Sequence, residues 1–486
     1  MTPRLAVLSR PETATPLPAP AQAEDDLRLV SLVAPAPLGD PVRVFLEARR
    51  QGHDAVLWHL PARREALVGV GAVTTLTAAG DQRFSHVSRQ WRTLAATALH
   101  FRVSETGLTE ARDAAGPLLM GGFAFAPGRH QGPWTAFGDA RMWVPRWVYQ
   151  VAGDRAWAHG QTAVPGGEDK AAAGQVAKVQ LDEVQAAVAR ALAGPDGRHN
   201  GAAGRGDALP AITRRDVPAK EEWLSAVRAV VEAIRAGEME KAVLARAVQV
   251  TAPGGFALEP ALRYLEEHYP DCYIFAIAQG DQCFLGATPE RLVRLQDGQV
   301  EVACLAGSIA RGRTPEEDGR LGDELLSSAK NRHEHQIVLD AILEGLAPLC
   351  ATVDAAPAPT LLKFANVQHL YTPVRARLRN GATVLELAAS LHPTPAIGGH
   401  PTERALAFIS RLEAAGRGWY AGPVGWVDGR GQGEFAVALR SALVSGEDAW
   451  LYAGCGIMAD SDPESEFDES CLKLRPMLSA LGAAGR

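Results

Sequence analysis

The sequence lacks several features that would place it in a familiar class at once. It has no run of about eighteen or more uncharged apolar residues, so a membrane span is not expected. Its 49 Lys and Arg are outnumbered by 56 Asp and Glu, and a net charge of -7 provides no basic stripe to neutralise nucleic-acid phosphates. Residues 1–26 show no continuous apolar core followed by a small-residue cleavage site. We therefore expect a disordered lead-in there, and no membrane or nucleic-acid partner.

Cysteine is also scarce, with 6 in the 486 residues. None belongs to a C-x-x-C pair or to a cluster with histidines at zinc-binding spacing. This pattern is typical of buried thiols in a reducing compartment, so it favours a cytoplasmic protein. The cysteines are Cys272, Cys283, Cys304, Cys350, Cys455 and Cys471.

The common nucleophile and nucleotide motifs are absent too. The sequence contains no G-x-S-x-G elbow, no Walker A sequence and no H-E-x-x-H. The segment GRGQGE, residues 429–434, has glycines spaced as in a nucleotide-binding loop, but it joins two strand patterns instead of opening a helix. We interpret it as a hairpin turn.

What the sequence does contain is a series of short apolar runs separated by Gly and Pro turns. The pair Asp297-Gly298 predicts a hairpin, and a Gly-rich segment over 194–210 parts an N-terminal half, 27–215, from a C-terminal region, 216–480. Helical spacing predicts helices over about 167–193 and 323–346. The segments GPVGWVD, EFAVALRSALV and AWLYAGCGIM predict a three-strand meander, followed by a helix that Asp462 caps. Because hairpins outnumber helix crossovers, we expect an α+β fold with large, mostly antiparallel sheets flanked by helices.

Two residues in apolar surroundings are candidates for acid–base chemistry. Lys241 begins a strand pattern, where its ammonium either reaches solvent or is desolvated and can serve as a neutral base. Glu290, in GATPERL, is either a solvated turn residue or a functional acid. The residues alone leave both alternatives open.

Carboxylates on two predicted helices are candidates for binding a hard cation. Glu466 and Glu469 share one face of the last helix, and Lys473 follows Glu469 by one turn, so the pattern fits either a surface ion pair or a Mg2+ site. Glu334 lies in an HEH triplet whose two histidines point to different sides, which disfavours a two-histidine metal site. A carboxylate ligand is the better hypothesis there.

Two further features predict anion binding. In EFAVALRSALV, strand alternation would place Arg440 beside Ala436 and Ala438, which leave room for a planar carboxylate. A salt bridge to another element is the alternative. The stretch CLAGSIARG, residues 304–312, has the small residues of a loop that lets the backbone approach an anion.

Taken in order, nine motifs resemble those of the chorismate-utilising enzymes, and within this family they are most similar to isochorismate synthases. The N-terminal half matches more loosely, through GGFAFAPG and WTAFGDARMWVP. The resemblance implies one large sandwich, so the Gly-rich segment would be a loop and not a domain boundary. The motifs are KAVLAR, FLGATPERL, CLAGSIARG, SSAKNRHEHQIV, VQHLYTPV, LHPTPAIGGHPT, RGWYAGPVGW, GEFAVALRSA and GCGIMADSDPESEFDESCLK.

The resemblance also implies a role for each candidate, matched by motif position. Lys241 would be the general base that activates water toward C2 of chorismate, and Glu290 the general acid that protonates the departing C4 hydroxyl. Mg2+ would be the cofactor, held by Glu334 and Glu469, with Glu466 as a further ligand or neighbour. The implied substrate-binding residues are Ala306, Gly307, Ser308, His369, Thr394, Tyr420, Arg440, Gly454 and Lys473.

Ala306 bears on the choice within the family. Aminodeoxychorismate synthases typically carry a lysine at the corresponding position, whereas alanine leaves space for water. Ser308 in LAGS and the segments around 391–402 and 417–426 are like those of isochorismate synthases. The sequence departs from the family at Cys304, where relatives often have proline, and at Asn331, where an acidic residue is common.

These features predict an isochorismate synthase that acts on chorismate as a monomer or homodimer, without a glutaminase subunit. Menaquinone biosynthesis is the expected pathway. The alternatives are a catechol siderophore pathway, or salicylate or anthranilate synthase-type activity. A catalytically silent chorismate binder is disfavoured because Lys241, Glu290 and the candidate metal ligands are all retained.

Overall fold

The computed structural model describes residues 27–104, 107–110, 116–128, 132–167, 169–193, 212–364, 367–379, 381–413 and 416–483. The lead-in expected over residues 1–26 and the Gly-rich segment 194–210 lie outside the described residues.

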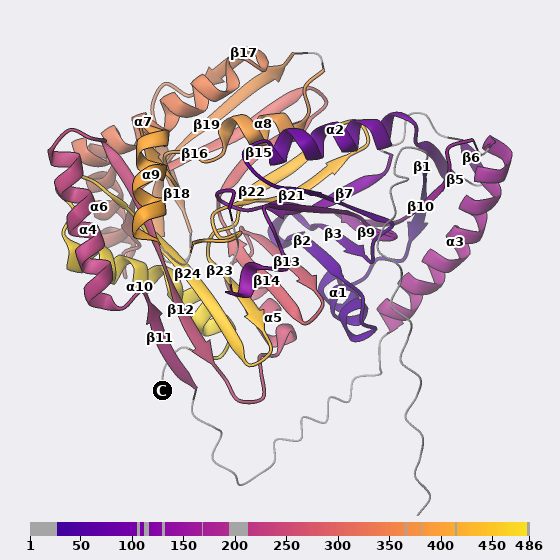
Figure 1. Cartoon of the computed structure of the whole chain (residues 1–486), viewed down its shortest axis with the longest axis horizontal. Coiled ribbons are helices and arrows are strands. Elements are labelled where there is room, and N and C mark those ends of the chain that lie inside the picture. The colour runs from indigo at the N-terminus through magenta and orange to yellow at the C-terminus, as the bar shows by residue number, and fades with distance from the viewer. Residues whose placement is uncertain are drawn as a thin grey trace, which may run out of the picture.

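The described strands form two sheets, and in Figure 1 most of the second sheet lies above the first. The first, 14-stranded sheet contains β1 (Leu27–Ala36), β2 (Ala55–Leu60), β3 (Glu65–Val70), β5 (Leu99–Ser104), β6 (Gly107–Glu110), β9 (Trp147–Ala152), β10 (Arg155–Pro165), β11 (Thr213–Val217), β12 (Lys241–Thr251), β13 (Tyr273–Gln279), β14 (Gln282–Thr288), β20 (Gly399–His400), β23 (Ser441–Ser445) and β24 (Asp448–Ile457). The second, 10-stranded sheet contains β4 (Thr74–Ala78), β7 (Leu118–Phe123), β8 (Ala140–Val144), β15 (Arg291–Gln296), β16 (Gln299–Ala310), β17 (Cys350–Ala355), β18 (Thr360–Lys363), β19 (Val367–Leu378), β21 (Pro423–Asp428) and β22 (Gly433–Val437).

Both sheets draw strands from both halves of the chain. The order in the first sheet is β11-β12-β24-β23-β14-β13-β2-β3-β9-β10-β1-β5-β6, with β20 beside β12. Within the described residues, only β1 and β5 pair in parallel. The expected α+β fold with mostly antiparallel sheets is therefore confirmed. The division expected between residues 215 and 216 falls inside β11.

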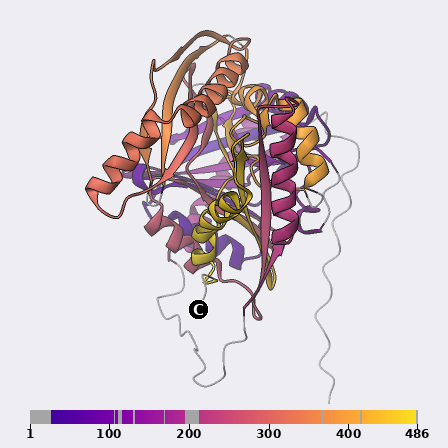
Figure 2. The same cartoon turned by 90° about the vertical axis from the view of Figure 1, so that its left-hand side faces the viewer.

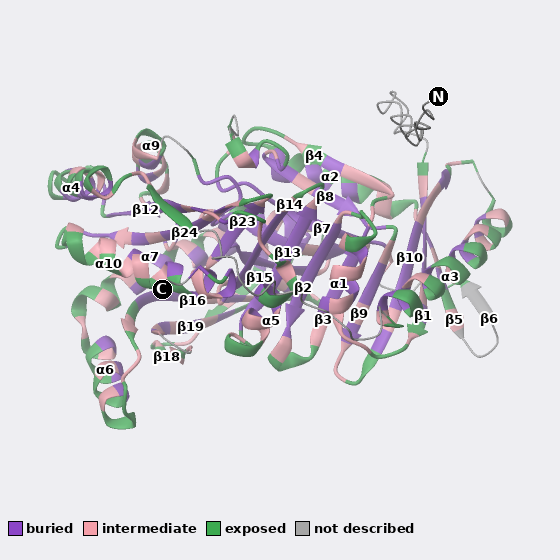
Figure 3. Ribbon diagram, turned by 90° about the horizontal axis from the view of Figure 1, so that it is seen from below, coloured by how far each residue is buried: buried purple, intermediate pink, exposed green. Residues whose placement is uncertain are grey.

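The apolar runs become strands that are buried on both faces. In β14, Phe284 points into the core between the sheets, where Phe123 and Phe435 of the second sheet also lie. Its neighbours Cys283 and Leu285 point to the opposite face of the first sheet, where helices pack. Figure 3 shows the result, a buried centre of strands with exposed residues concentrated on the outer faces of helices.

Helices cover the outer sides of both sheets. Against the second sheet lie α2, α7 and α8, while α1, α5 and α10 pack on the first. Figure 2 shows α4 in magenta and α9 in orange along the edge of the first sheet, where both contact β12. The helices are α1 (Pro41–Arg50), α2 (Arg83–Ala96), α3 (Lys170–Ala193), α4 (Lys220–Arg235), α5 (Leu258–His268), α6 (Pro315–Ser327), α7 (Ala329–Leu346), α8 (Val384–Leu391), α9 (Thr402–Leu412) and α10 (Pro463–Ala480).

Two other expectations concern the thiols and the helices. All six cysteines are free; five are buried, as predicted, whereas Cys471 is partly exposed. None of the helices in the described ranges combines the length and the apolar character needed to cross a membrane.

The prediction of a single long helix over residues 323–346 is wrong. The chain forms two helices, α6 and α7, because Ser328 between them is extended (φ -65°, ψ 113°). The Ser328 hydroxyl accepts a hydrogen bond from the Asn331 backbone N–H at 3.3 Å and so caps α7. This break fixes where α7 begins and places Glu334 in its second turn.

The prediction of a three-strand meander near the C-terminus is also wrong. β21 and β22 pair in the second sheet, joined by the hairpin turn predicted for GRGQGE, but β23 and β24 pair in the first sheet. Residues 438–440 carry the chain from one sheet to the other, and Arg440 has a left-handed backbone with φ 49°. EFAVALRSALV is therefore two strands and not one.

Candidate active site

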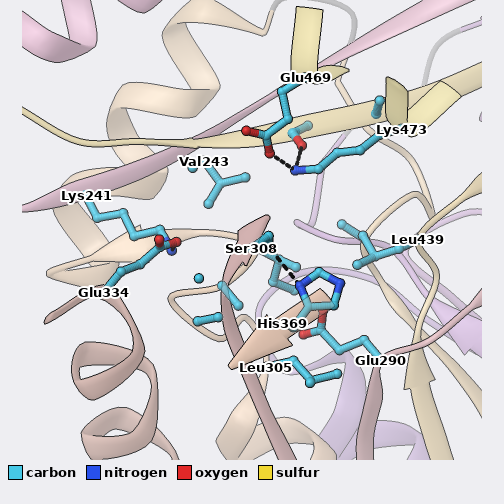
Figure 4. Close-up of a pocket in the computed structure, with 18 of the residues that line it drawn as sticks. Lys241, Val243, Glu290, Leu305, Ser308, Glu334, His369, Leu439, Glu469 and Lys473 are labelled. Atoms are coloured by element: carbon cyan, nitrogen blue, oxygen red, sulfur yellow. Dashed lines mark hydrogen bonds and ion pairs between the residues drawn. The ribbon is translucent and has the colours of Figure 1, made fainter. Parts of the chain in front are cut away.

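A cavity of about 320 Å³ lies where the two sheets and two helices meet. Its walls come from β12, β16 and β24, from α7 and α10, and from residues 417–421 and 439–440. Figure 4 shows side chains from these elements directed into one space. Every candidate residue that the sequence predicted lines this cavity, except Thr394. Such a volume is in the range of small-molecule sites.

Lys241 is desolvated, which decides between the two alternatives for this residue. Its side chain is 1% exposed, and its Nζ donates a hydrogen bond to Glu334 Oε1 at 2.5 Å. Gly456 of β24 makes room for this pair, because a Cβ there would lie 2.9 Å from Lys241 Cε and 3.3 Å from Glu334 Oε1. Sequence reasoning missed Gly456, although a glycine within a strand pattern is a sign of close approach.

Glu290 is a partly buried acid between β14 and β15, and not a solvated turn residue. Burial raises its pKa to about 7, against the opposing effect of the positive charges of Lys241, Lys473 and Arg440. Its backbone is fixed as well, because its carbonyl accepts a hydrogen bond from the Val437 N–H at 2.9 Å. A carboxyl with this pKa holds a proton at neutral pH often enough to donate it.

The stretch CLAGSIARG is not a free loop, since β16 continues to Ala310. It contains a bulge: Leu305 pairs with Tyr371 and Ser308 with His369 on β19, and Ala306 and Gly307 have no partner between them. Gly307 has φ 76°, which favours glycine. The bulge therefore presents backbone to the cavity where a regular strand would not.

Ser308 and His369 face each other on these paired strands. The Ser308 hydroxyl is hydrogen-bonded to His369 Nδ1 at 2.6 Å, as Figure 4 shows. Burial lowers the pKa of His369 to about 3, and the nearby charges of Arg440 and Lys473 act in the same direction. His369 is therefore a neutral hydrogen-bonding group in the cavity.

Thr394 lies behind the cavity wall. Its carbonyl accepts hydrogen bonds from the Ile397 N–H at 3.1 Å and the Gly398 N–H at 2.9 Å, so it shapes a turn. Its hydroxyl is buried, with no hydrogen-bond partner among the described residues. Ala396 and Ile397 form the wall instead. The prediction that Thr394 lines the pocket is wrong, since Thr394 is not among the lining residues.

Arg440 reaches the cavity by a route that strand alternation did not predict. It lies in the crossover between sheets, where its carbonyl accepts from the Ala287 N–H at 3.2 Å. Within the described part of the chain its guanidinium forms no ion pair at 4.0 Å or less. The salt bridge that was the alternative is thus not seen there, and the guanidinium is available for an anionic ligand.

Tyr420 is buried beside this cation. Burial raises the pKa of its phenol to about 12, so it is a neutral hydrogen-bond donor. Its ring stacks on Tyr452, with centroids 5.2 Å apart. Gly454 lies beside it, and a Cβ at that position would lie 2.8 Å from the Leu244 carbonyl oxygen, so the close approach of β12 and β24 favours glycine there.

The acidic residues of α10 form a cluster at another wall of the cavity. Ligand atoms of Glu466, Glu469 and Cys455 lie within 4.8 Å of one another. Lys473 Nζ donates to Glu469 Oε1 at 2.6 Å and to the Gly454 carbonyl at 2.9 Å. The ion pair that was the simpler alternative is therefore present, and it faces the cavity.

The charges of this cluster influence one another. Lys473 lowers the pKa of Glu469, whereas burial raises the pKa of Glu466 and the neighbouring charge of Glu469 raises it further. Two neighbouring carboxylates are ligands that suit a hard cation such as Mg2+. A thiol does not suit such a cation. Glu334 is turned toward Lys241 and is not part of the cluster.

The family is shown by comparison with known proteins. The family described as "Chorismate binding enzyme" matches residues 16–482, and the chain belongs to it. It is 37% identical over 451 residues to isochorismate synthase MenF of Bacillus subtilis, covering 92% of both chains. It is 38% identical to the salicylate biosynthesis isochorismate synthase of Pseudomonas aeruginosa, covering 92% of this chain and 88% of the relative. The solved structure of MenF, the menaquinone-specific isochorismate synthase from Escherichia coli, matches with a TM-score of 0.73 and 27% identity over 94% of both chains.

We predict that Arg440→Lys weakens chorismate binding by about 10- to 100-fold, because hydrogen bonds to a charged group contribute about 1.5–3 kcal/mol and lysine cannot reproduce the bidentate fork. Equilibrium titration of the purified protein with chorismate measures the change. Arg311→Lys is the matched control, since Arg311 pairs with Asp318 and does not line the cavity. Unchanged affinity in Arg440→Lys would remove this residue from the binding site.

Proposed function

We propose that the chain is an isochorismate synthase, which converts chorismate to isochorismate by adding water at C2 and releasing the hydroxyl from C4. The observation that carries this proposal is the presence in one cavity of a desolvated amine, Lys241, and a carboxyl with a pKa of about 7, Glu290. The names of the relatives reported above support it.

The reaction needs one group that takes a proton and one that gives a proton. In the proposed mechanism Lys241 acts in its unprotonated form: Nζ takes a proton from the attacking water, and the ammonium that results pairs with the Glu334 carboxylate. Glu290 gives its proton to the C4 hydroxyl, which leaves as water while the ring double bond moves. One water enters and one leaves, so substrate and product are isomers.

Ala306 supports water as the nucleophile. Its side chain is a methyl group at the cavity wall, and it offers no amine that could attack the substrate. The residues facing the bulge, Ser308 and the neutral His369, are hydrogen-bonded to each other. We therefore propose that the attacking water lies in this cavity near Lys241.

Substrate carboxylates would be held on two sides. We assign the enolpyruvyl carboxylate to Arg440, Tyr420 and the backbone amide of Gly307, because all three residues line the cavity and Arg440 has no ion pair among the described residues. The ring carboxylate would lie on the side of the acidic cluster, where a bound cation would balance the negative charge. Gly454 and Lys473 complete this side.

We propose Mg2+ as the cofactor, with Glu469 and Glu466 as the residues that would hold it; Glu334, the third predicted ligand, is bonded to Lys241 and would have to turn from it to join them. The crowding of Glu466 and Glu469 supports the assignment. A bound Mg2+ would supply positive charge that neutralises the ring carboxylate. Cys455 has no role in this proposal, since a hard cation prefers oxygen.

Two pathways are compatible with this activity. We propose menaquinone biosynthesis, on the strength of the long N-terminal half and of the matched MenF relatives. Supply of isochorismate for salicylate or a catechol siderophore is the second candidate, because a relative of equal similarity is named for salicylate biosynthesis.

The function is tested by incubating the purified protein with chorismate and Mg2+ without any ammonia source. We expect isochorismate as the product. Lys241→Ala should lower kcat by about 100-fold or more, because positioned general bases contribute about 10²–10⁴-fold. Salicylate with pyruvate, or anthranilate formed only when ammonia is added, would contradict the proposal.

The proposed role of Glu290 as the acid predicts how activity depends on pH. Its raised pKa means that the acid form is present below about pH 7 and is lost as the pH rises through that value. We therefore expect kcat/KM to fall about tenfold per pH unit above that point. Glu290→Gln should be nearly inactive, whereas Glu301→Gln on β16 should keep the wild-type profile. A profile that stays flat from pH 6 to pH 9 would exclude Glu290 as the acid.

Magnesium dependence gives a separate prediction. Protein treated with EDTA should lose activity and regain it with added Mg2+. Glu469→Gln should raise the half-saturating Mg2+ concentration at least about tenfold, since it removes a charged ligand. Glu464→Gln is the matched control on the same helix, because Glu464 is exposed and pairs with Lys220. Full activity in EDTA would contradict the cofactor assignment.

A further inference from the structure

His335 is a buried polar residue that the proposed reaction does not use. It follows Glu334 on α7 and is 3% exposed, whereas His333, the other histidine of the triplet, has a 62% exposed side chain beside Glu240. The two histidines thus point to different sides, as the sequence predicted. The His335 ring lies under the bulge of β16 and does not line the cavity.

Both ring nitrogens of His335 have partners. Nδ1 donates to the Ala306 carbonyl at 3.1 Å, and Nε2 accepts from the Thr372 hydroxyl at 2.7 Å. Thr372 is 1% exposed and lies on β19 opposite Cys304. The Cys304 sulfur packs 3.7 Å from His335 Nε2. The ring is therefore held in one orientation between two strands.

The hydrogen bond to Ala306 lies where the regular strand pairing is interrupted. The bulge leaves Ala306 and Gly307 without residue partners on β19, and at this break the buried Ala306 carbonyl accepts from His335. Leaving such a group unpaired is costly, and the peptide would turn to find another donor. His335 removes the reason for this rotation.

The orientation of this peptide decides where the next amide points. A trans peptide is planar, so the Gly307 N–H is directed opposite to the Ala306 carbonyl. Because His335 holds the carbonyl, the N–H of the same peptide points away from the His335 ring, at a residue that lines the cavity. A left-handed φ of 76° at Gly307 keeps the chain in this conformation.

We propose that His335 is a positioning residue, which holds the Ala306–Gly307 peptide so that the Gly307 amide is presented to a carboxylate of chorismate. This role rests on the proposed function. It also gives a role to two residues of the HEH triplet, because one turn of α7 then positions two parts of the cavity. Glu334 faces Lys241 from the cavity side, while His335 fixes the backbone of β16 from below.

The proposal is tested with three variants. His335→Leu removes both hydrogen bonds, Thr372→Val removes only the support of Nε2, and His335→Asn keeps an N–H near the position of Nδ1. His333→Asn on the exposed side of the same helix is the matched control. For each variant we would measure KM and kcat with chorismate, and the melting temperature.

The expected result separates positioning from folding. A misdirected amide weakens substrate binding, so KM should rise about tenfold in His335→Leu, a change of about 1.4 kcal/mol in binding free energy. Thr372→Val should show a smaller rise, and His335→Asn should be close to wild type. A purely structural role would lower the melting temperature and the amount of active enzyme, and so lower apparent kcat at constant KM.

If His335→Leu does not fold, Thr372→Val carries the test, because it removes a single hydroxyl at nearly constant volume. Folded variants with the KM of the wild type would overturn the role of His335. Wild-type protein that makes no isochorismate would instead overturn the proposed function. In that case, the affinity of the variants for chorismate still tests the positioning.

Discussion

The site depends on a lysine ammonium buried against a glutamate. Lys241 opens β12 of the first sheet, and Glu334 lies on α7, which packs against the second sheet, so their contact joins the two layers. A desolvated ion pair adds little net stability, but removing one partner leaves an unpaired buried charge. The pair therefore fixes how the layers meet more than how strongly they hold together. Gly456 allows the pair its present position, because a Cβ there would lie 2.9 Å from Lys241 Cε.

Around this pair, charge and burial divide the cavity into parts with different chemistry. Burial raises the pKa of Glu290 to about 7. Burial and the nearby cations lower the pKa of His369, so its ring is uncharged. Lys473 is satisfied by Glu469 and the Gly454 carbonyl, whereas Arg440 has no ion pair within the described residues. The residues around the cavity thus provide a proton donor, neutral hydrogen-bonding groups and a cation that is available to substrate.

Much of the fold and most of the site could be predicted from sequence, for identifiable reasons. Strands and hairpins were predictable because alternation, turn residues such as Asp297-Gly298 and apolar runs are local signals. The break at Ser328 and the crossover at Arg440 were not, because each depends on which sheet or helix the following residues join. Arg440 was placed in the site for a wrong reason, since its position follows from a left-handed turn. Thr394, Gly456 and the contact of His335 with the bulge needed the tertiary structure, which alone shows which side chains share a wall.

The central claim is that this cavity activates water and directs it to C2 of chorismate, with Ala306 leaving the space that an amine would occupy. Conversion of chorismate in H2(18)O, followed by mass spectrometry of the product, tests it most directly. Attack by water with loss of the original hydroxyl predicts isochorismate that carries one (18)O in its ring hydroxyl. Isochorismate without the label would show that the C4 hydroxyl is transferred within the substrate, and it would contradict the assignment of Lys241 and Glu290 as base and acid.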